Sequence, residues 1–261
     1  MLLAVDIGNT NIVMGIFDNG SLAGRWRLRS QRNLTEDEIH VFSNNVFFKN
    51  GLTYNDVSGV IISSVVPPLS RSLEKFCEKY LGQSPYRVDA SSVPDMPLLV
   101  DDPHSVGADR IVNAVAAFHK YRSSLIVVDF GTATTIDYIS ESGAYLGGTI
   151  SPGLKISSDA LFQKTSLLPR MDRFTLPDSV IAKDTISSMN AGIIYGYAGL
   201  VDGIVRHTKK EIDSDPKVIA TGGLASLIAE VAETIDTVEP NLTLEGLWII
   251  YEKRGNKAAK A

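Results

Sequence analysis

A single cysteine, Cys77, occurs among the 261 residues of the sequence, so no internal disulfide can form. This excludes the disulfide-dense secreted domains and removes the need for an oxidising compartment. A surplus of positive charge is also lacking, because 25 Lys and Arg face 30 Asp and Glu, a formal net charge of −5. Proteins that coat nucleic acids normally carry a basic surface, and we therefore expect no nucleic-acid partner.

Long hydrophobic runs are missing as well. No uncharged apolar stretch approaches the roughly 18 residues from which a membrane-spanning helix is built. The N-terminal apolar residues 2–5 meet Asp6 without a basic region or a cleavage pattern. We expect a cytoplasmic protein without membrane contact, and a flexible tail at the polar, basic residues 256–261.

Two common kinds of site are absent from the sequence. It has no G-x-x-x-x-G-K-[ST] pattern, which excludes a P-loop nucleotide site. Its four histidines have no metal-ligand spacing with one another or with Cys77, so we expect no zinc site. The composition, 44% hydrophobic and 21% charged, is that of a globular protein. The length allows one large domain or two domains of about 130 residues each.

The strongest signal along the chain is a duplication. Apolar residues 2–5 run into the motif DIGNT at 6–10, and apolar residues 125–128 run into DFGTAT at 129–134. Short apolar runs bounded by glycine indicate central strands that are covered on both faces. Fragments of any α/β protein can look alike, but the repeated motif in the same context favours two related domains.

The segments after each acid also correspond. Each half predicts a hairpin, a further strand, a helix and a short last strand. The hairpin turns lie at 18–20 and 140–143, and the helices at 67–81 and 224–234. Two longer helices, at 105–121 and 191–212, cover the sheets. We predict an α/β fold with an N-terminal domain at 1–121 and a C-terminal domain at 122–255.

An aspartate at the end of a strand, followed by glycine and by asparagine or threonine, suits phosphate binding. Glycine lets the backbone approach an oxyanion, and the neighbouring N–H groups can point at it. The carboxylate can face the cation that neutralises the phosphates. A single turn of this kind is often only a turn. Two of them in a duplicated context favour a polyphosphate site.

An acid and an arginine stand together in the motif GADR at 107–110, near the start of the predicted helix 105–121. In a structural interpretation, Asp109 complements the helix dipole and pairs with a solvated neighbour. In a functional interpretation, Asp109 accepts the proton of a substrate hydroxyl and Arg110 binds a carboxylate or phosphate. The spacing alone leaves both open.

Two glycine-rich segments are further candidates. The second hairpin is expected to end with a strand at 144–150. Residues 147–153 (GGTISPG) overlap the end of that strand and are predicted to connect the hairpin to a helix, either as a mere turn or as a backbone lining for a ligand. The motif TGG at 221–223 follows the predicted strand 217–220 and could let a nucleobase or ribose lie against bare backbone.

Together these motifs resemble those of type III pantothenate kinases, in the superfamily of acetate and sugar kinases, heat-shock chaperones and actin. The resemblance extends from Asp6 to about Tyr251. Phosphate motifs of this kind are shared across the superfamily, but the GADR motif before the second one is typical of this family. It implies two duplicated ribonuclease-H-like domains, each a mixed sheet flanked by helices, and a homodimer. It also implies ATP-dependent phosphorylation of pantothenate to 4'-phosphopantothenate, the first step of coenzyme A biosynthesis, with Mg²⁺ or another divalent ion and with K⁺ or NH₄⁺.

The resemblance also implies roles for single residues. Asp109 would be the catalytic base, Asp6 would face the divalent ion that accompanies ATP, and Asp129 would bind potassium. Substrate contacts are implied at Gly107, Ala108, Asp109, Arg110 and Thr185, and ATP contacts at Asp6, Ile7, Gly8, Asn9, Thr10, Asn11, Ile12, Val13, Thr132, Gly222 and Gly223. Two positions depart from the family pattern: Ala182 replaces the usual glycine, and Val100 replaces a tyrosine near the pantothenate.

Two other functions remain open at this point. One is a different small-alcohol or sugar kinase of the superfamily, although the chain is short and lacks their larger insertions. The other is a non-enzymatic regulator that responds to nucleotide, against which the intact Asp109 argues. The apolar helix expected at 188–205 is buried either under its own sheet or against a partner; the resemblance favours the dimer.

Overall fold

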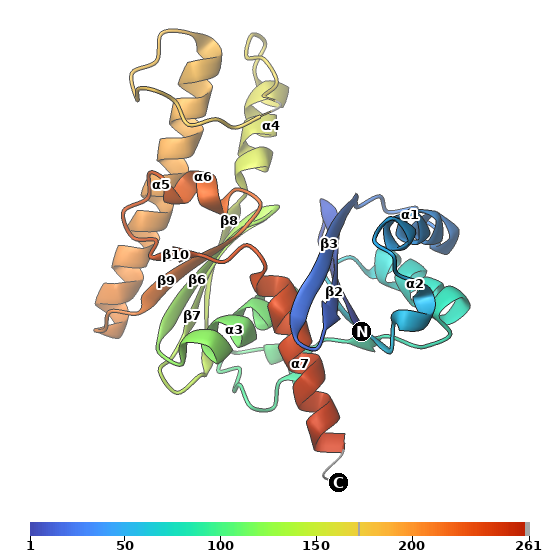
Figure 1. Cartoon of the computed structure of the whole chain (residues 1–261). Helices are drawn as coiled ribbons and strands as arrows, with labels where there is room; N and C mark the ends of the chain where they lie inside the picture. Colours follow the sequence, from blue (N-terminus) through green and yellow to red (C-terminus); the bar gives the residue numbers. More distant parts are fainter. Residues whose placement is uncertain (172, 259–261) are drawn as a thin grey trace. The chain divides into compact units, whose positions relative to one another are not determined.

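The computed structural model describes residues 1–171 and 173–258, with side chains up to Gly255. These residues form two compact units, each built on a five-stranded mixed sheet (Figure 1). The first unit consists of Met1–Pro97, Asp101–His119 and the C-terminal helix. The second consists of Leu98–Val100 and Lys120–Asn241.

The first sheet has the strand order β3-β2-β1-β4-β5. Strand β2 is antiparallel to β1 and β3, whereas β4 is parallel to β1 and β5. The turn between β2 and β3 places Asn19 and Gly20 at positive φ, 45° and 85°, as the predicted Asp-Asn-Gly hairpin requires. The strands are β1 (Leu2–Ile7), β2 (Asn11–Asp18), β3 (Ser21–Arg29), β4 (Gly59–Ser64) and β5 (Tyr86–Arg87).

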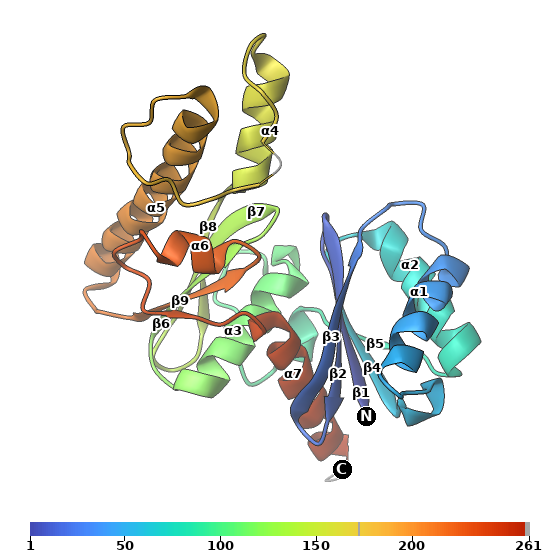
Figure 2. The same cartoon turned by 45° about the horizontal axis from the view of Figure 1, so that its top comes forward.

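Helices cover both faces of the first sheet. Helices α1 and α2 lie on one face and α7 lies on the other (Figure 2). The core between the sheet and the first two helices contains alternate residues of β1 and β2, such as Ile7 and Ile12, both 0% exposed. The helices of this unit are α1 (Glu36–Lys49), α2 (Pro67–Phe76), the π-helical turn Cys77–Leu81, α3 (Ala108–Tyr121) and α7 (Leu242–Ala258).

The second sheet has the order β10-β9-β6-β7-β8 and repeats the first. Strand β7 is antiparallel to β6 and β8, whereas β9 is parallel to β6 and β10. Helix α5 packs its apolar face on this sheet. The elements are β6 (Leu125–Phe130), β7 (Ala133–Ile139), β8 (Tyr145–Pro152), α4 (Leu154–Lys164), α5 (Thr185–Ile212), β9 (Lys217–Gly222), α6 (Ala225–Ala229) and β10 (Thr237–Val238).

The duplication is confirmed down to the register of the strands. Asp6 is the second-last residue of β1 and lies between Val13 and Ser63 on the neighbouring strands. Asp129 is the second-last residue of β6 and lies between Thr135 and Thr221. The predicted fold class, an α/β protein with two mixed sheets flanked by helices, is therefore confirmed.

Two predicted elements of the second unit need correction. The strand expected at 144–150 is β8, which runs to Pro152, so the glycine-rich segment is mostly strand and not a connection; Gly148 lies opposite Asp137 and Pro152 opposite Ala133. The helix predicted at 224–234 is only the short α6, and the chain after it bends back through turns toward β10.

The predicted domain limits also differ from the two units. Helix α7 belongs to the first unit instead of a C-terminal domain at 122–255. The cause is close packing: a Cβ atom at Gly246 would lie 2.2 Å from the carbonyl oxygen of Val112 in α3. Residues 256–258 of the predicted tail are helical, and residues 259–261 lie outside the described residues. In the part of the chain that the structure describes, no helix is long and apolar enough to span a membrane.

Candidate active site

The first candidate phosphate turn joins β1 to β2. The N–H of Gly8 donates to the carbonyl of Asn11 at 3.0 Å, which closes the turn and leaves Asn9 and Thr10 exposed. The turn is held from β3 as well, because Ser30 donates its hydroxyl to Gly8 O at 2.6 Å and its N–H to Thr10 O at 3.0 Å. A turn fixed at three points can keep its backbone donors in place for an anion.

Side chains around this turn divide between two faces of the sheet. Ile7 and Ile12 are buried in the core, so only their backbone can serve the ATP contacts predicted for them. Asp6 is half-buried on the opposite face, in one row with Val13 and Ser63. The Ser63 hydroxyl is fully buried and has no hydrogen-bond partner among the described residues, which marks a polar position beside Asp6.

The GADR motif lies at the start of α3 in the same unit. The Oδ1 atom of Asp109 accepts the N–H of Arg110 at 2.8 Å. Desolvation raises the pKa of Asp109, and the Arg110 N–H and charge oppose this rise only in part. A carboxylate with a raised pKa is a better proton acceptor than an ordinary aspartate.

Gly107 is required by the position of this carboxylate. A Cβ atom at residue 107 would lie 2.5 Å from Asp109 Oδ1 and 3.7 Å from Val65 Cγ1. Val65 in turn donates its N–H to the carbonyl of Ile7 at 3.1 Å. The structure thus brings the GADR motif next to the end of β1, from which the first phosphate turn starts.

The second candidate phosphate turn, at 129–134, lies in the second unit against Gly222. A Cβ atom at Gly222 would lie 2.6 Å from Asp129 Oδ1, and Gly222 has a φ of +94°. Both facts demand glycine at this position. The predicted potassium ligand and the predicted nucleotide-contacting glycine are therefore in direct contact, whereas Gly223 is exposed.

The N-terminus of α4 closes the other side of this turn. The N–H of Gly153 donates to Thr132 O at 3.1 Å, and a Cβ atom at Gly153 would lie 2.6 Å from Gly131 O. Gly153, the last residue of the glycine-rich segment, thus packs on the turn, although most of that segment is a strand.

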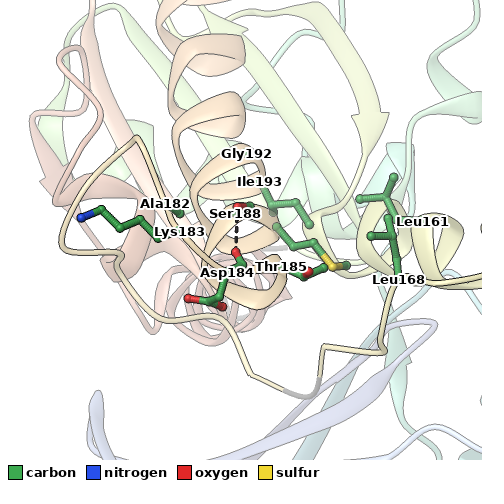
Figure 3. Close-up of a pocket in the computed structure, with 10 residues that line it drawn as sticks. Leu161, Leu168, Ala182, Lys183, Asp184, Thr185, Ser188, Gly192 and Ile193 are labelled. Atoms are coloured by element: carbon green, nitrogen blue, oxygen red, sulfur yellow. Dashed lines mark hydrogen bonds between the residues drawn. The ribbon is translucent and has the colours of Figure 1, made fainter.

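Thr185 lies in a separate part of the second unit, at the start of α5. It lines an open cavity of about 670 Å³ between α4, α5 and the segment that joins them (Figure 3). The cavity has a polar rim at Asp184 and Thr185 and an apolar wall that includes Leu161, Leu168 and Ile193. Ala182, one of the departures from the family pattern, is also part of its lining.

The donor set decides which ions fit. Within the described residues no group of three or more His, Cys, Asp or Glu side chains could hold a metal by itself. Single carboxylates at strand ends fit a divalent ion that is bound mainly through phosphate oxygens, as Mg²⁺ usually is. Asp6 beside the unpaired Ser63 hydroxyl is such a place.

Sequence reasoning missed one support of the first turn and one helix. Nothing local distinguishes Ser30, whose two bonds hold the first turn, because the contact joins segments about twenty residues apart. Helix α1 was also missed, although Thr35 and Glu38 form a capping box that is a recognisable start signal.

Comparisons with known proteins identify the family of this chain. A family model described as type III pantothenate kinase matches residues 2–207. The type III pantothenate kinase of Desulfatibacillum aliphaticivorans is 54% identical over 256 residues, covering 98% of this chain and 100% of that one. That of Syntrophobacter fumaroxidans is 55% identical over 253 residues, covering 97% of this chain and 98% of that one.

Solved structures at low sequence identity support the fold alone. A protein of Campylobacter jejuni described as a Baf family transcriptional activator has a TM-score of 0.60 at 20% identity, covering 97% of this chain and 99% of that one. Component A of the (R)-2-hydroxyglutaryl-CoA dehydratase of Acidaminococcus fermentans has a TM-score of 0.56 at 13% identity, covering 97% and 98%. With a family model over most of the chain and relatives above half identity, the chain belongs to the type III pantothenate kinase family.

Proposed function

We propose that this chain phosphorylates pantothenate with ATP, yielding 4'-phosphopantothenate in the first step of coenzyme A biosynthesis. The main support for this reaction is that the chain belongs to the type III pantothenate kinase family. The observation that supports Asp109 as the base is local. Its carboxylate has a raised pKa, and it lies against Gly107, which packs beside the end of β1.

In this proposal Asp109 accepts the proton of the primary hydroxyl of pantothenate as that oxygen attacks the γ-phosphorus. The N–H of Arg110 keeps the carboxylate oriented, and the Arg110 side chain binds an anionic group of the substrate. The backbone of the turn at 8–11 binds phosphate oxygens. A divalent ion neutralises phosphate charge, and Asp6 would hold it. Such transfer depends mainly on positioning and charge stabilisation.

The test is pantothenate-dependent release of ADP, measured beside a panel of sugars and other small alcohols. We expect turnover with pantothenate only. Turnover with a sugar and none with pantothenate would favour the second kinase function, and nucleotide binding without any acceptor would favour a regulator.

We also propose that the reaction needs a monovalent cation in addition to the divalent ion. Asp129 is the second-last residue of the central strand β6 and touches Gly222, and its carboxylate would hold potassium. Replacing K⁺ with Na⁺ or with tetramethylammonium should lower the rate. Equal rates in the three salts would remove this role from Asp129.

We further propose a homodimer that forms through α4, α5 and the segment between them. Helix α5 was expected to be apolar on most sides, yet Gly192, Gly196 and Gly199 are exposed, and a Cβ atom at any of them would meet nothing within 4 Å. Large apolar side chains are exposed in the same region, among them Leu167 at 92%, Ile181 at 83% and Ile186 at 53%. Exposed apolar surface of this extent is typical of a protein interface.

Two variants test the dimer. Gly196→Trp should block close approach along α5, and Ile181→Asp should place a charge in the apolar surface without touching the core. Both should give a monomer mass in light scattering and weaker pantothenate binding with an unchanged circular dichroism spectrum. A parent protein that is monomeric at micromolar concentration and fully active would end this proposal.

A further inference from the structure

The outer strand of the first sheet carries a row of arginines that the proposed mechanism does not use. Residues of β3 alternate between exposed and half-buried, and Arg25, Arg27 and Arg29 occupy exposed positions. Successive side chains of a strand point to opposite faces, so the three arginines share one face. Trp26 and Leu28 point the other way, toward the core under α1 and α2.

The arginine face is also the face of Asp6. Arg27 lies opposite Val13 on β2, and Val13 lies opposite Asp6 on β1, so these three residues form one row across the sheet. Neighbouring strands are about 4.8 Å apart, which puts the Arg27 and Asp6 backbones about 10 Å from each other. An extended arginine side chain and one phosphate group together span that distance.

Arg29 is placed even closer to the phosphate turn. It lies opposite Asn11, the last residue of the turn, and the next residue is Ser30, which bonds to both Gly8 and Thr10. The end of β3 therefore cannot shift without moving the turn. Arg27 and Arg29 have no ion pair or hydrogen bond to the other described residues, so each guanidinium is available to a ligand.

We propose that Arg27 and Arg29 bind the polyphosphate of the nucleotide held at the turn 8–11. The inference rests on the proposed phosphate role of that turn. A guanidinium presents a planar fork of N–H donors that matches phosphate oxygens. The backbone N–H groups of the turn also donate to phosphate, but they carry no full charge that would neutralise it. The two arginines would add positive charge beside the turn, on the face of the sheet that also carries Asp6.

The experiment compares Arg27→Gln, Arg29→Gln and the double variant with Arg25→Gln. Arg25 is the matched control, because it lies on the same strand and face but opposite Gly15, away from the turn. Binding of ATP, of inorganic tripolyphosphate and of adenosine is measured by calorimetry without pantothenate, and KM for ATP and for pantothenate is measured in turnover.

We expect each of Arg27→Gln and Arg29→Gln to weaken ATP and tripolyphosphate about tenfold, with adenosine and the KM for pantothenate unchanged. Arg27→Lys should recover part of the loss, because it keeps the charge without the fork. Arg25→Gln should behave as the parent does. The salt dependence of ATP binding should become less steep in the double variant.

Three results would overturn the inference. Unchanged ATP affinity in the double variant would show that the arginines serve another purpose, and self-association of that variant would identify protection of the sheet edge as the purpose. An equal loss of adenosine binding would show a general structural effect. An equal loss of ATP affinity in Arg25→Gln would show that the positive charge of the whole strand attracts the nucleotide, without specific contacts from Arg27 and Arg29. Failure of the proposed function is seen separately, as absence of pantothenate turnover in the parent.

Discussion

The outer strands β3 and β8 occupy the same place in two sheets of the same order, yet they present opposite chemistry. β3 exposes Arg25, Arg27 and Arg29, whereas β8 exposes Leu146 and Ile150, at 40% and 66%. The second sheet thus exposes large apolar side chains at the place where the first sheet exposes three cations.

The two acids at the centres of the sheets differ in the same way. Asp6 is followed by an exposed turn that Ser30 holds from the outer strand. Asp129 is closed in by Gly222, whose counterpart in the first sheet is Ser64. A duplicated scaffold therefore places one carboxylate before an exposed turn and the other beside a tight backbone turn. The comparison teaches that strand order fixes where the acids stand, while their neighbours decide what each can bind.

The largest expected effect concerns the helices that follow the last strand of each sheet. Helix α3 carries Asp109 in its first turn, and α7 carries Glu245 in its first turn. We expect Asp109→Asn to lower kcat about 10²–10⁴-fold, because it removes the base and keeps the shape. Its melting temperature should not fall, because desolvation penalises the charged form that the parent holds.

Glu245→Gln is the matched control for that variant and should retain the rate of the parent. Steady-state kinetics and thermal melts of both variants decide the matter. Turnover of Asp109→Asn within about threefold of the parent would refute the assignment of the base, since a general base contributes far more than this.

The next effect separates the two adjacent glycines after β9. Gly222→Ala should be destabilising by about 1–3 kcal/mol, because the residue has a positive φ and its Cβ would meet the Asp129 carboxylate. The displaced carboxylate should also lose its response to potassium. Gly223→Ala should be neutral, because a Cβ atom there meets nothing within 4 Å.

Denaturant unfolding and potassium titrations of both glycine variants provide the measurement. Equal stability of the two would contradict the tight contact between Gly222 and Asp129.

The pH dependence of kcat/KM should be a smaller effect with a clear sign. The pKa of Asp109 lies above its ordinary value of 3.8, so protonation removes the base at a higher pH than for an exposed aspartate. Activity should therefore fall on the acid side at a pH above that ordinary value, and the residual rate of Asp109→Asn should lack this limb. An acid limb that survives in the variant would belong to another group.

The smallest effect concerns Glu239, which ties two segments of the second unit. Its carboxylate accepts from Lys120 Nζ at 2.7 Å and from the Tyr121 hydroxyl, and these partners hold its pKa below the ordinary value despite desolvation. A lowered native pKa stabilises the fold above the unfolded-state pKa, and the gain is lost as pH falls through the native value. Glu239→Gln should thus lower the melting temperature by about 2–4 °C near neutral pH.

Thermal melts of the parent and of Glu239→Gln across the acidic range check this. The difference between them should shrink as the pH falls, because the parent then also becomes protonated. A difference that stays constant with pH would assign the effect to packing.

The sequence by itself determined the hairpin turns and the central strands, because these depend on residues that are close together in the chain. The hairpin turn at Asn19 and Gly20 follows from residues that tolerate positive φ, and the central strands follow from apolar runs that end in the two Asp-x-Gly motifs. The repeat of those motifs was enough to predict two related α/β domains, and the family resemblance added that each sheet is mixed. Candidate site residues such as Gly107 and Asp109 could also be recognised, because they lie in one short motif.

Tertiary structure alone decided the features that depend on distant segments. Strand β8 continues past residue 150 to Pro152 because β7 offers it a pairing edge, and α7 joined the first unit because Gly246 lets it approach α3. The row of Asp6, Val13 and Arg27 exists only through the register of three strands. No pattern along the chain encodes such a register by itself, because it results from burying one face of each strand in a common core.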